Sequence, residues 1–223
     1  MTILKTQVFG RSLIGIYLIA NNSFILYPPN LLKSKLEEFK SIFNIPFYPQ
    51  SINNSNLIGV YAVSNKYGII VPSIIREDEL ESLKSNLGEA YQIGVLHSID
   101  NTFGNLILCN DKGAIISSLL KDFRKEISDV LNVETEVYEF AGFYLPGSIS
   151  ISNNKGCLVH PLTTEEEIEH ITSILKVEET DVSTINRGIP FLRSGAIIND
   201  SCGIFGINST GPELMRLTSV LRI

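Results

Sequence analysis

The chain has 223 residues, of which 44% are hydrophobic and 19% are charged. This composition excludes a long disordered region, and the length allows a sizeable buried core. The formal net charge is −6, whereas proteins that hold nucleic acid mainly through its phosphates are basic. Any contact with nucleic acid must therefore come from a local patch or through a basic protein partner.

The N-terminal segment, Thr2 to Gly10, is predicted to be a lone strand with apolar residues at Ile3, Leu4, Val8 and Phe9. Lys5 and Arg11 then precede an apolar run, Leu13 to Ala20, that imitates a short signal peptide. We predict a strand here instead, because the run has the same register as four later segments. No apolar run is long enough to cross a bilayer, so we expect no membrane partner.

One pattern then occurs five times: an apolar run after a glycine, a polar turn, a second apolar run, a helix and a further strand. The glycines are spaced by 44, 45, 43 and 48 residues, and the turn residues by 44, 45, 43 and 47. The glycines are Gly15, Gly59, Gly104, Gly147 and Gly195, and the turn residues are Asn21, Asn65, Asn110, Asn153 and Asp200. Periods of this length are typical of solenoids, propellers and arrays.

Each unit is predicted to contain one amphipathic helix, from apolar residues at helical spacing and from N-terminal capping signals. The first three helices are expected at Asn30 to about Phe43, at about Arg76–Leu87 and at about Ser118–Leu131. The fourth is expected to begin at a capping box, either Thr163 with Glu166 or Thr164 with Glu167, and the fifth to begin at Thr210 with Glu213. The strands that follow the first four helices are expected within Ile45–Ile52, Ala90–Leu96, Glu136–Ala141 and Val182–Asn186.

The fifth unit ends at its helix and lacks the last strand, while the chain begins with a spare one. Pairing these two ends would complete the fifth unit and remove exposed strand edges. The sequence thus predicts an α/β fold, a five-bladed propeller with five-fold pseudosymmetry that the N-terminal strand closes. We expect one domain, residues 1–223, made of strand 2–10 and repeats at about 11–53, 54–98, 99–142, 143–188 and 189–223.

Four motifs make the chain resemble the translation initiation factor 6 family across its whole length. They are NKYGIIVP at Asn65–Pro72, FGNLILCNDKGAI at Phe103–Ile115, SNNKGCLVHP at Ser152–Pro161 and TINRG at Thr184–Gly188. The chain stops at Ile223, without the tail of eukaryotic members, and so resembles the archaeal form. The resemblance implies the pentein fold and a non-enzymatic, monomeric, cytoplasmic factor that prevents ribosomal subunits from associating and takes part in biogenesis of the large subunit.

The resemblance also implies a binding site. Family contacts with the large ribosomal subunit lie just after the repeat glycines, which correspond here to Val60, Asn105 and Ile149. The implied partners are a ribosomal protein and the sarcin–ricin loop of the ribosomal RNA, and no DNA. Asn186 and Arg187 form a further candidate contact with RNA phosphate, with a solvated turn as the alternative.

Other residue types allow a different interpretation. Related pentein folds include enzymes that modify guanidino groups with a nucleophilic cysteine, and Cys202, His160 and Asp200 supply such residue types. However, the three cysteines, which include Cys109 and Cys157, are isolated, without a CxxC pair. They indicate a reducing compartment rather than disulfides or a zinc site. The sequence has no P-loop, GxGxxG, HExxH or EF-hand motif, so we expect no cofactor and no metal.

Two sets of polar residues are expected to be structural. Asn65, Asn110 and Asn153 occupy one position of the repeat and are predicted to form turns. The acidic runs Glu77–Glu79 and Glu165–Glu167 are predicted to be solvated first turns of helices, where negative charge complements the helix dipole.

Overall fold

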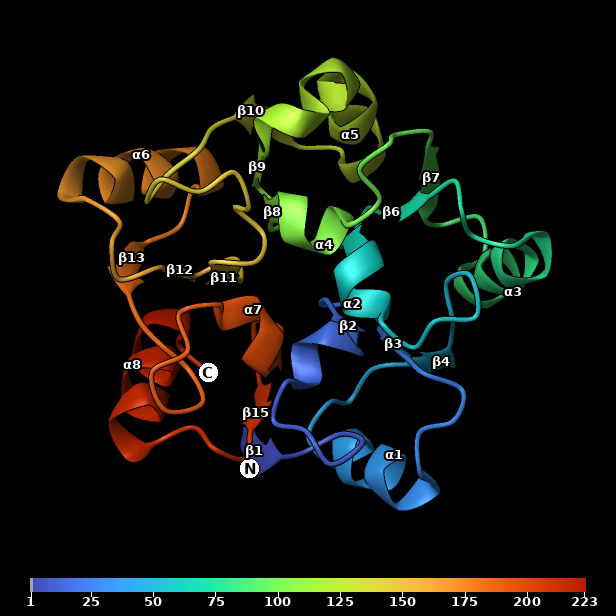
Figure 1. Ribbon diagram of the computed structural model, residues 1–223. Helices are drawn as coiled ribbons and strands as arrows, with labels where there is room; N and C mark the ends of the chain where they lie inside the picture. The colour runs from blue at the N-terminus through green and yellow to red at the C-terminus, as the bar shows by residue number, and fades with distance from the viewer. Residues whose placement is uncertain (1) are drawn as a thin grey trace.

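The computed structural model describes residues 2–223, which form a mixed α/β fold with five three-stranded sheets. Figure 1 shows the sheets arranged around a common centre, with the longer helices on the outside. The strands are β1 Ile3–Thr6, β2 Ile19–Ala20, β3 Ile25–Tyr27, β4 Phe47–Pro49, β5 Val63–Ser64, β6 Gly68–Pro72, β7 Gln92–Leu96, β8 Ile107–Cys109, β9 Gly113–Ile116, β10 Glu134–Val137, β11 Ile151–Ser152, β12 Gly156–Val159, β13 Glu179–Val182, β14 Ala196–Ile198 and β15 Gly203–Gly206.

All five sheets share one topology. A short inner strand pairs antiparallel with the middle strand, as β5 does with β6, and the middle strand pairs parallel with the outer one, as β6 does with β7. Parallel neighbours need a crossover connection, which a helix of the same unit provides in the first four units. The predicted order of strand, turn, strand, helix and strand is therefore confirmed, although the outer strands β10 and β13 begin two or three residues earlier than predicted.

The first strand of the chain completes the last sheet. β1 pairs parallel with β15 from Ile3 opposite Gly203 to Thr6 opposite Gly206. The N-terminus consequently lies beside the fifth unit in Figure 1. This pairing confirms the prediction that the spare N-terminal strand supplies the missing strand of unit five.

The segments that carry the repeat glycines were predicted to be strands, and this is wrong. In units one, two, three and five the chain makes a single helical turn here and enters the inner strand only afterwards. These turns are η1 Ile14–Ile16, α2 Ile58–Tyr61, α4 Phe103–Leu106 and α7 Leu192–Gly195. Consecutive turns pack so closely that a Cβ on Gly104 would lie 1.9 Å from the carbonyl oxygen of Gly59. A compact turn that carries glycine at the point of contact fits this close packing. The apolar pattern of the sequence does not reveal a helical turn this short.

The register of unit five also needs correction. Gly15 packs on the carbonyls of Arg193 and Ala196 in the way that Gly59 packs on those of Gly15 and Leu18. Arg193, and not Gly195, therefore occupies the fifth glycine position. The turn residue is likewise one earlier than predicted: the fifth tip asparagine is Asn199, whose Oδ1 accepts the N–H groups of Ser201 and Cys202.

The longer helices are α1 Lys33–Lys40, α3 Glu77–Leu87, α5 Arg124–Leu131, α6 Glu165–Leu175 and α8 Gly211–Leu221, with a 3₁₀ helix, η2 Ser118–Phe123, before α5. Of the two predicted capping boxes for α6, Thr164 with Glu167 is the one that forms. Because η2 precedes α5, the helix predicted over Ser118–Leu131 begins as a 3₁₀ helix and becomes α-helical only at Arg124.

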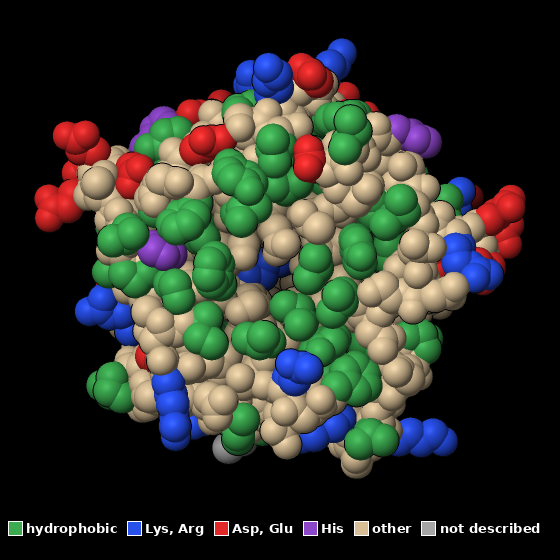
Figure 2. All heavy atoms as spheres, viewed as in Figure 1, with side chains coloured by type: hydrophobic (Ala, Val, Ile, Leu, Met, Phe, Trp, Pro, Cys, Tyr) green, Lys and Arg blue, Asp and Glu red, His purple; other side chains and the backbone are tan. Residues whose placement is uncertain are grey.

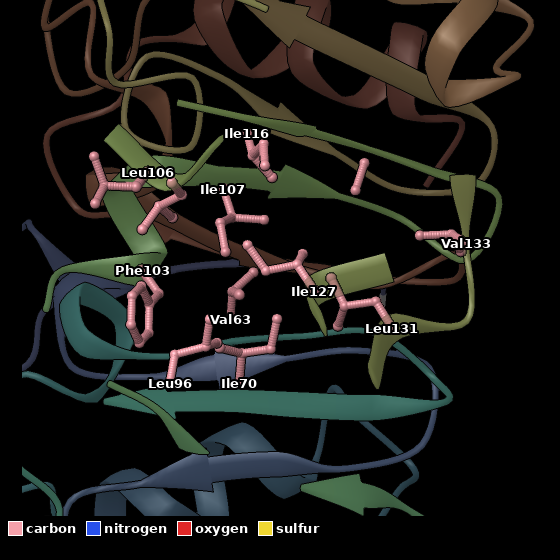
Figure 3. Close-up of a cluster of buried hydrophobic side chains, with 12 residues drawn as sticks. Val63, Ile70, Leu96, Phe103, Leu106, Ile107, Ile116, Ile127, Leu131 and Val133 are labelled. Atoms are coloured by element: carbon pink, nitrogen blue, oxygen red, sulfur yellow. The ribbon is translucent and has the colours of Figure 1, made fainter. Parts of the chain in front are cut away.

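The hydrophobic core lies between neighbouring units rather than within each one. Figure 3 shows one cluster in which Val63 and Ile70 of unit two meet Leu106, Ile127 and Leu131 of unit three. The other four clusters likewise join adjacent units, and the cluster around Ile14 and Ile204 joins units one and five. Because every cluster combines residues of two units, no unit has a complete core of its own. Burial of each such side chain stabilises the fold by about 1.5–3 kcal/mol, so the units stabilise one another.

Buried asparagines at the hairpin tips connect the units. We define the tip asparagines as Asn21, Asn65, Asn110, Asn153 and Asn199. The side-chain oxygen of Asn110 accepts the N–H groups of Lys112 and Gly113, which closes its own turn. Its amide nitrogen donates to the carbonyl of Asn153 in the next unit at 3.1 Å and to that of Leu175, at the end of the next helix, at 2.9 Å. Asn65 and Asn153 repeat this arrangement, so the predicted turn role is confirmed and an inter-unit role is added.

We predict that Asn110→Ala lowers the free energy of unfolding by more than a single hydrogen bond contributes. The substitution removes four hydrogen bonds and leaves the buried Leu175 carbonyl and Gly113 N–H without these partners, and each unsatisfied buried group costs about 1–3 kcal/mol. Urea denaturation provides the measurement. Asn208→Ala, at an exposed position, serves as the control, and equal stability of the two variants would contradict the inter-unit role.

Gly104→Ala should also destabilise the protein, by roughly 1–3 kcal/mol or more, because the atom that its Cβ meets belongs to the backbone and cannot move aside alone. Gly211→Ala is the matched control, since a Cβ at this first residue of α8 meets nothing within 4 Å. Its effect should be neutral or slightly stabilising. Equal midpoints for the two alanine variants in urea would show that close packing of the turns is unimportant.

Candidate functional site

The short turns before the inner strands gather on one side of the molecule, which we call the glycine-turn face. It consists of η1, α2, α4, α7 and the turn at residues 146–148, together with the rim segments 8–13, 52–57, 97–102, 140–145 and 185–191 that lead into them. Figure 1 views this face directly, and Figure 2 shows hydrophobic side chains around a central hollow on it. Exposed apolar side chains in four rim segments contribute to this surface: Phe9, Ile99, Tyr144 and Phe191.

Two of the predicted contact residues lie on this face. Val60 is in α2 and Asn105 in α4, and both are half-buried. The backbone of Asn105 is occupied, because its N–H donates to Thr102 and its carbonyl accepts from Ser148 at 3.1 Å. Its side chain makes no hydrogen bond to any residue in the range 2–223, which leaves the amide available to a partner.

Ile149 does not belong to the site. Its side chain is 0% exposed and packs in a core cluster with Leu108 and Phe140. The prediction placed it one residue too far along, because Ser148 is the residue that follows Gly147 as Asn105 follows Gly104. Ser148 is half-buried on the glycine-turn face.

Asn186 and Arg187 have different roles. The Asn186 side chain is buried, and its amide donates to the carbonyl of Ser12 at 3.0 Å, so it holds unit five against unit one. Arg187 is exposed in the same rim segment, with left-handed backbone at φ 67°. Of this pair, only Arg187 can meet a partner.

Three glutamates that the sequence assigned to helix first turns hold the rim segments in place. Glu213, the third residue of α8, accepts the N–H groups of Arg187 and Gly188 at 3.2 and 2.9 Å. Glu79 of α3 accepts those of Asn53 and Asn54 at 2.6 and 2.7 Å, and Glu167 accepts that of Ala141. Consecutive N–H groups in left-handed backbone form a concave anion site, and the carboxylate fills it.

Burial and hydrogen bonding oppose each other at these carboxylates. Burial of Glu213 disfavours its charge, but the N–H groups of Thr210, Gly188 and Arg187 and the Thr210 hydroxyl outweigh it and lower its pKa to about 2. The pKa of Glu79 is lowered in the same way, by the Ser51 hydroxyl and by backbone N–H groups. The prediction of solvated acids is therefore wrong for Glu79, which is buried, whereas Glu167 is half-buried and reaches the rim through the N–H of Ala141. The capping-box spacing in the sequence indicates that the third residue of each helix binds the N-terminal residue of that helix. It does not reveal that the same carboxylate also binds a rim segment.

The rim carries little of the protein's negative charge. Its charged residues are Arg11, Arg187 and Asp100, in a chain with net charge −6. Most acids instead lie on the outer helices, such as the first turns of α3 and α6. The glycine-turn face is thus apolar and aromatic with two exposed arginines.

Polar residues next to the tip asparagines are joined by hydrogen bonds at the opposite end of the inner strands. We call Asn22, Lys66, Asp111, Asn154 and Asp200 the lid. The Nδ2 atoms of Asn22 and Asn154 each donate to one oxygen of Asp111 and one of Asp200, at 2.6 to 3.0 Å. The other oxygens of these aspartates accept the backbone N–H groups of Lys66 and Asn154. Both carboxylates are therefore fully engaged.

The residues of the enzyme alternative do not converge. Cys202 is buried, its thiol contacts Asn199 Oδ1, and burial raises the pKa of the thiol to about 11. His160 Nδ1 accepts the N–H of Leu162, and Asp200 belongs to the lid. Each of the three groups has its own partners, and an unreactive buried thiol is not a nucleophile.

Within residues 2–223, no group of three or more His, Cys, Asp or Glu residues is placed to hold a metal ion. Over the same residues, no helix has the length and apolar character that crossing a membrane requires.

Comparison with known proteins identifies relatives over nearly the whole chain. The model of the eIF-6 family matches residues 3–220. Three similar proteins, each named Translation initiation factor 6, come from Methanococcus vannielii, Staphylothermus marinus and Pyrobaculum arsenaticum. Their identities are 40% over 222 residues, 36% over 219 and 34% over 220, and each alignment covers at least 96% of both chains. These relatives are named as translation factors and not as enzymes.

We predict that acid weakens the rim through Glu213. Because the pKa of this carboxyl is lower in the folded chain, the unfolded chain takes up the proton first as pH falls. The stabilisation is complete above about pH 4.5 and is lost towards pH 2, a change of order 3 kcal/mol. Unfolding free energies of the parent and of Glu213→Gln, measured from pH 7 to 2, should converge at low pH. Glu165→Gln, at an exposed position of α6, should run parallel to the parent, and parallel curves for Glu213→Gln would contradict the contact.

Proposed function

Because the chain belongs to the eIF-6 family of translation initiation factors, we propose that it binds the large ribosomal subunit and sterically prevents premature association with the small subunit. The glycine-turn face is the docking surface in this proposal. The observation that carries it is the half-buried Asn105 side chain, which is free of hydrogen bonds within residues 2–223 while the N–H and carbonyl of the same residue are both hydrogen-bonded. Binding groups are characteristically held on loops that a rigid scaffold positions.

The architecture that we infer is a single closed domain, a five-bladed α/β propeller of the pentein type with five-fold pseudosymmetry. The five sheets around one centre, the pairing of β1 with β15 and the core clusters between neighbours support it. A body closed in this way presents its docking face as one rigid unit. Such rigidity suits a factor that acts by occupying space as a monomer.

The chemistry of the face supports two kinds of contact. The exposed Phe9, Tyr144 and Phe191 provide the aromatic area that is enriched at protein interfaces, which fits a ribosomal protein. Arg11 and Arg187 provide charge for phosphates of ribosomal RNA, in the region of the sarcin–ricin loop. The acids on the outer helices favour approach of basic ribosomal proteins. We place the factor in the cytoplasm, with a role in biogenesis of the large subunit and none on DNA.

Sedimentation of purified ribosomal subunits with the protein tests the proposal. We expect the protein to migrate with the large subunit and to reduce the yield of joined ribosomes. The lack of migration with the large subunit, or of any effect on joining, would exclude the proposed activity.

Asn105→Ser should weaken binding to the large subunit about tenfold, which corresponds to about 1.4 kcal/mol, while the melting temperature changes little. The smaller side chain loses its reach towards the partner, but its backbone contacts remain. Affinity from sedimentation and the melting temperature are measured together. Ser201→Ala, exposed near the lid, is the control and should bind as the parent does. A Tm loss in Asn105→Ser that parallels the affinity loss would assign the residue to folding instead.

A further inference from the structure

Arg193 departs from the repeat pattern in a way that the docking face does not explain. It occupies the position at which the other four units have glycine. Its side chain crosses the centre from unit five to the non-adjacent unit two. There Nε and Nη2 approach the carbonyl oxygens of Gly59 and Ala62 at 3.4 and 3.5 Å. Both contacts lie at the long limit for hydrogen bonds.

Behind Arg193 the centre contains a cavity of about 50 Å³, several times the ~10–15 Å³ that one water molecule requires. Its walls carry Arg193, Ser64, Cys109 and Ser152 among aliphatic residues of the inner strands. A second space of about 40 Å³ shares Ser64, Cys109 and Ser152 with it and continues to the lid. The cavity therefore lies between a guanidinium at one end and the lid at the other.

The charge of Arg193 has no counterpart nearby. Burial lowers the pKa of the guanidinium, yet arginine stays protonated in proteins. Among residues 2–223, none of the ion pairs includes Arg193. Cys109 supplies no negative charge, because burial raises the pKa of its thiol to about 12. The lid aspartates accept hydrogen bonds from Asn22, Asn154 and backbone N–H groups, and among the described residues neither of them forms an ion pair with Arg193.

A second donor faces the same space. The Ser64 hydroxyl oxygen accepts the amide of Asn21 at 3.1 Å, and it donates to no residue in the described part of the chain. Its hydrogen is therefore free to point into the cavity. Ser152, in contrast, donates to the carbonyls of Asn153 and Gly156. The cavity thus offers a cation and a hydroxyl donor within largely apolar walls.

We propose that this cavity binds one small inorganic anion of halide size, held by the Arg193 guanidinium and the Ser64 hydroxyl. The Arg193 guanidinium is half-buried, a charge drawn partly out of water is costly unless it is paired, and an anion here would neutralise it. Aliphatic walls favour a monovalent, weakly hydrated ion, and the volume excludes a large one. Figure 2 shows Lys or Arg side-chain atoms at the bottom of the central hollow, so the path for the ion runs through the glycine-turn face. The proposal does not rest on ribosome binding, although the path to the site opens on the same face.

Bromide provides the direct probe. Crystals of the parent protein soaked in sodium bromide should show an anomalous difference peak within hydrogen-bond distance of Arg193 and Ser64 Oγ. The same soak of Arg193→Met, which keeps an unbranched side chain as far as the ε position and removes the guanidinium, should show none. The absence of a peak in the parent would overturn the proposal. A peak that persists in Arg193→Met would mean an adventitious ion only, and would overturn it as well.

A solution measurement accompanies the crystals. The melting temperature of the parent should be higher in sodium chloride than in sodium gluconate of equal ionic strength, because gluconate is too large for the cavity. Arg193→Met should show the same melting temperature in both salts. If that variant does not fold, Arg193→Gly, which restores the glycine of the other units, takes its place. A salt difference that survives the loss of the charge, or none in the parent, would contradict the site.

Discussion

The buried side-chain amide of each tip asparagine is the interaction on which the arrangement of the five units depends. Its oxygen closes the turn of its own hairpin, and its nitrogen, in four of the units, binds the backbone of the next unit. Because one group serves both purposes, the turn cannot form without presenting its donor to the neighbour. Leaving such a buried group unpaired costs about 1–3 kcal/mol. The same asparagine side chain therefore fixes both the turn of its own hairpin and the position of the next unit.

At the other end of the inner strands, close packing provides the matching constraint. The turn of each unit lies directly on the carbonyls of the preceding turn, and the absence of a side chain on Gly59 and Gly104 permits it. The rim segments lie outside these turns, where Glu79 and Glu213 bind their N–H groups from the adjacent helices. The glycine-turn face is thus fixed both from the centre and from the outer helices. Arg193 is the exception at the centre, and its unpaired charge is what makes the cavity there distinctive.

The sequence predicts the number of units, the element order and the pairing of the first strand with the last sheet, because these follow from a repeated apolar pattern. It does not predict the helical turns at the repeat glycines, since one turn is too short to show helical periodicity. The errors at Gly195 and Asp200 have one source, because apolar matching leaves the register uncertain by one or two residues. Packing of the glycine turns and the hydrogen bonds of Asn199 resolve that register, and burial shows that Ile149, which the resemblance implied, is one residue beyond Ser148. The role of Glu213 was also hidden, since its partners in the rim are 25 or more residues away along the chain.

A structure of the complex with the large ribosomal subunit would show which face of the protein the subunit covers, and so tests the proposed docking surface. We expect the glycine-turn face to be buried, with the Asn105 amide in contact with the subunit. We also expect Arg187 to lie against RNA phosphate and the lid to remain open to solvent. A complex in which the lid or the outer helices face the subunit, while α2 and α4 stay exposed, would contradict the proposed docking surface.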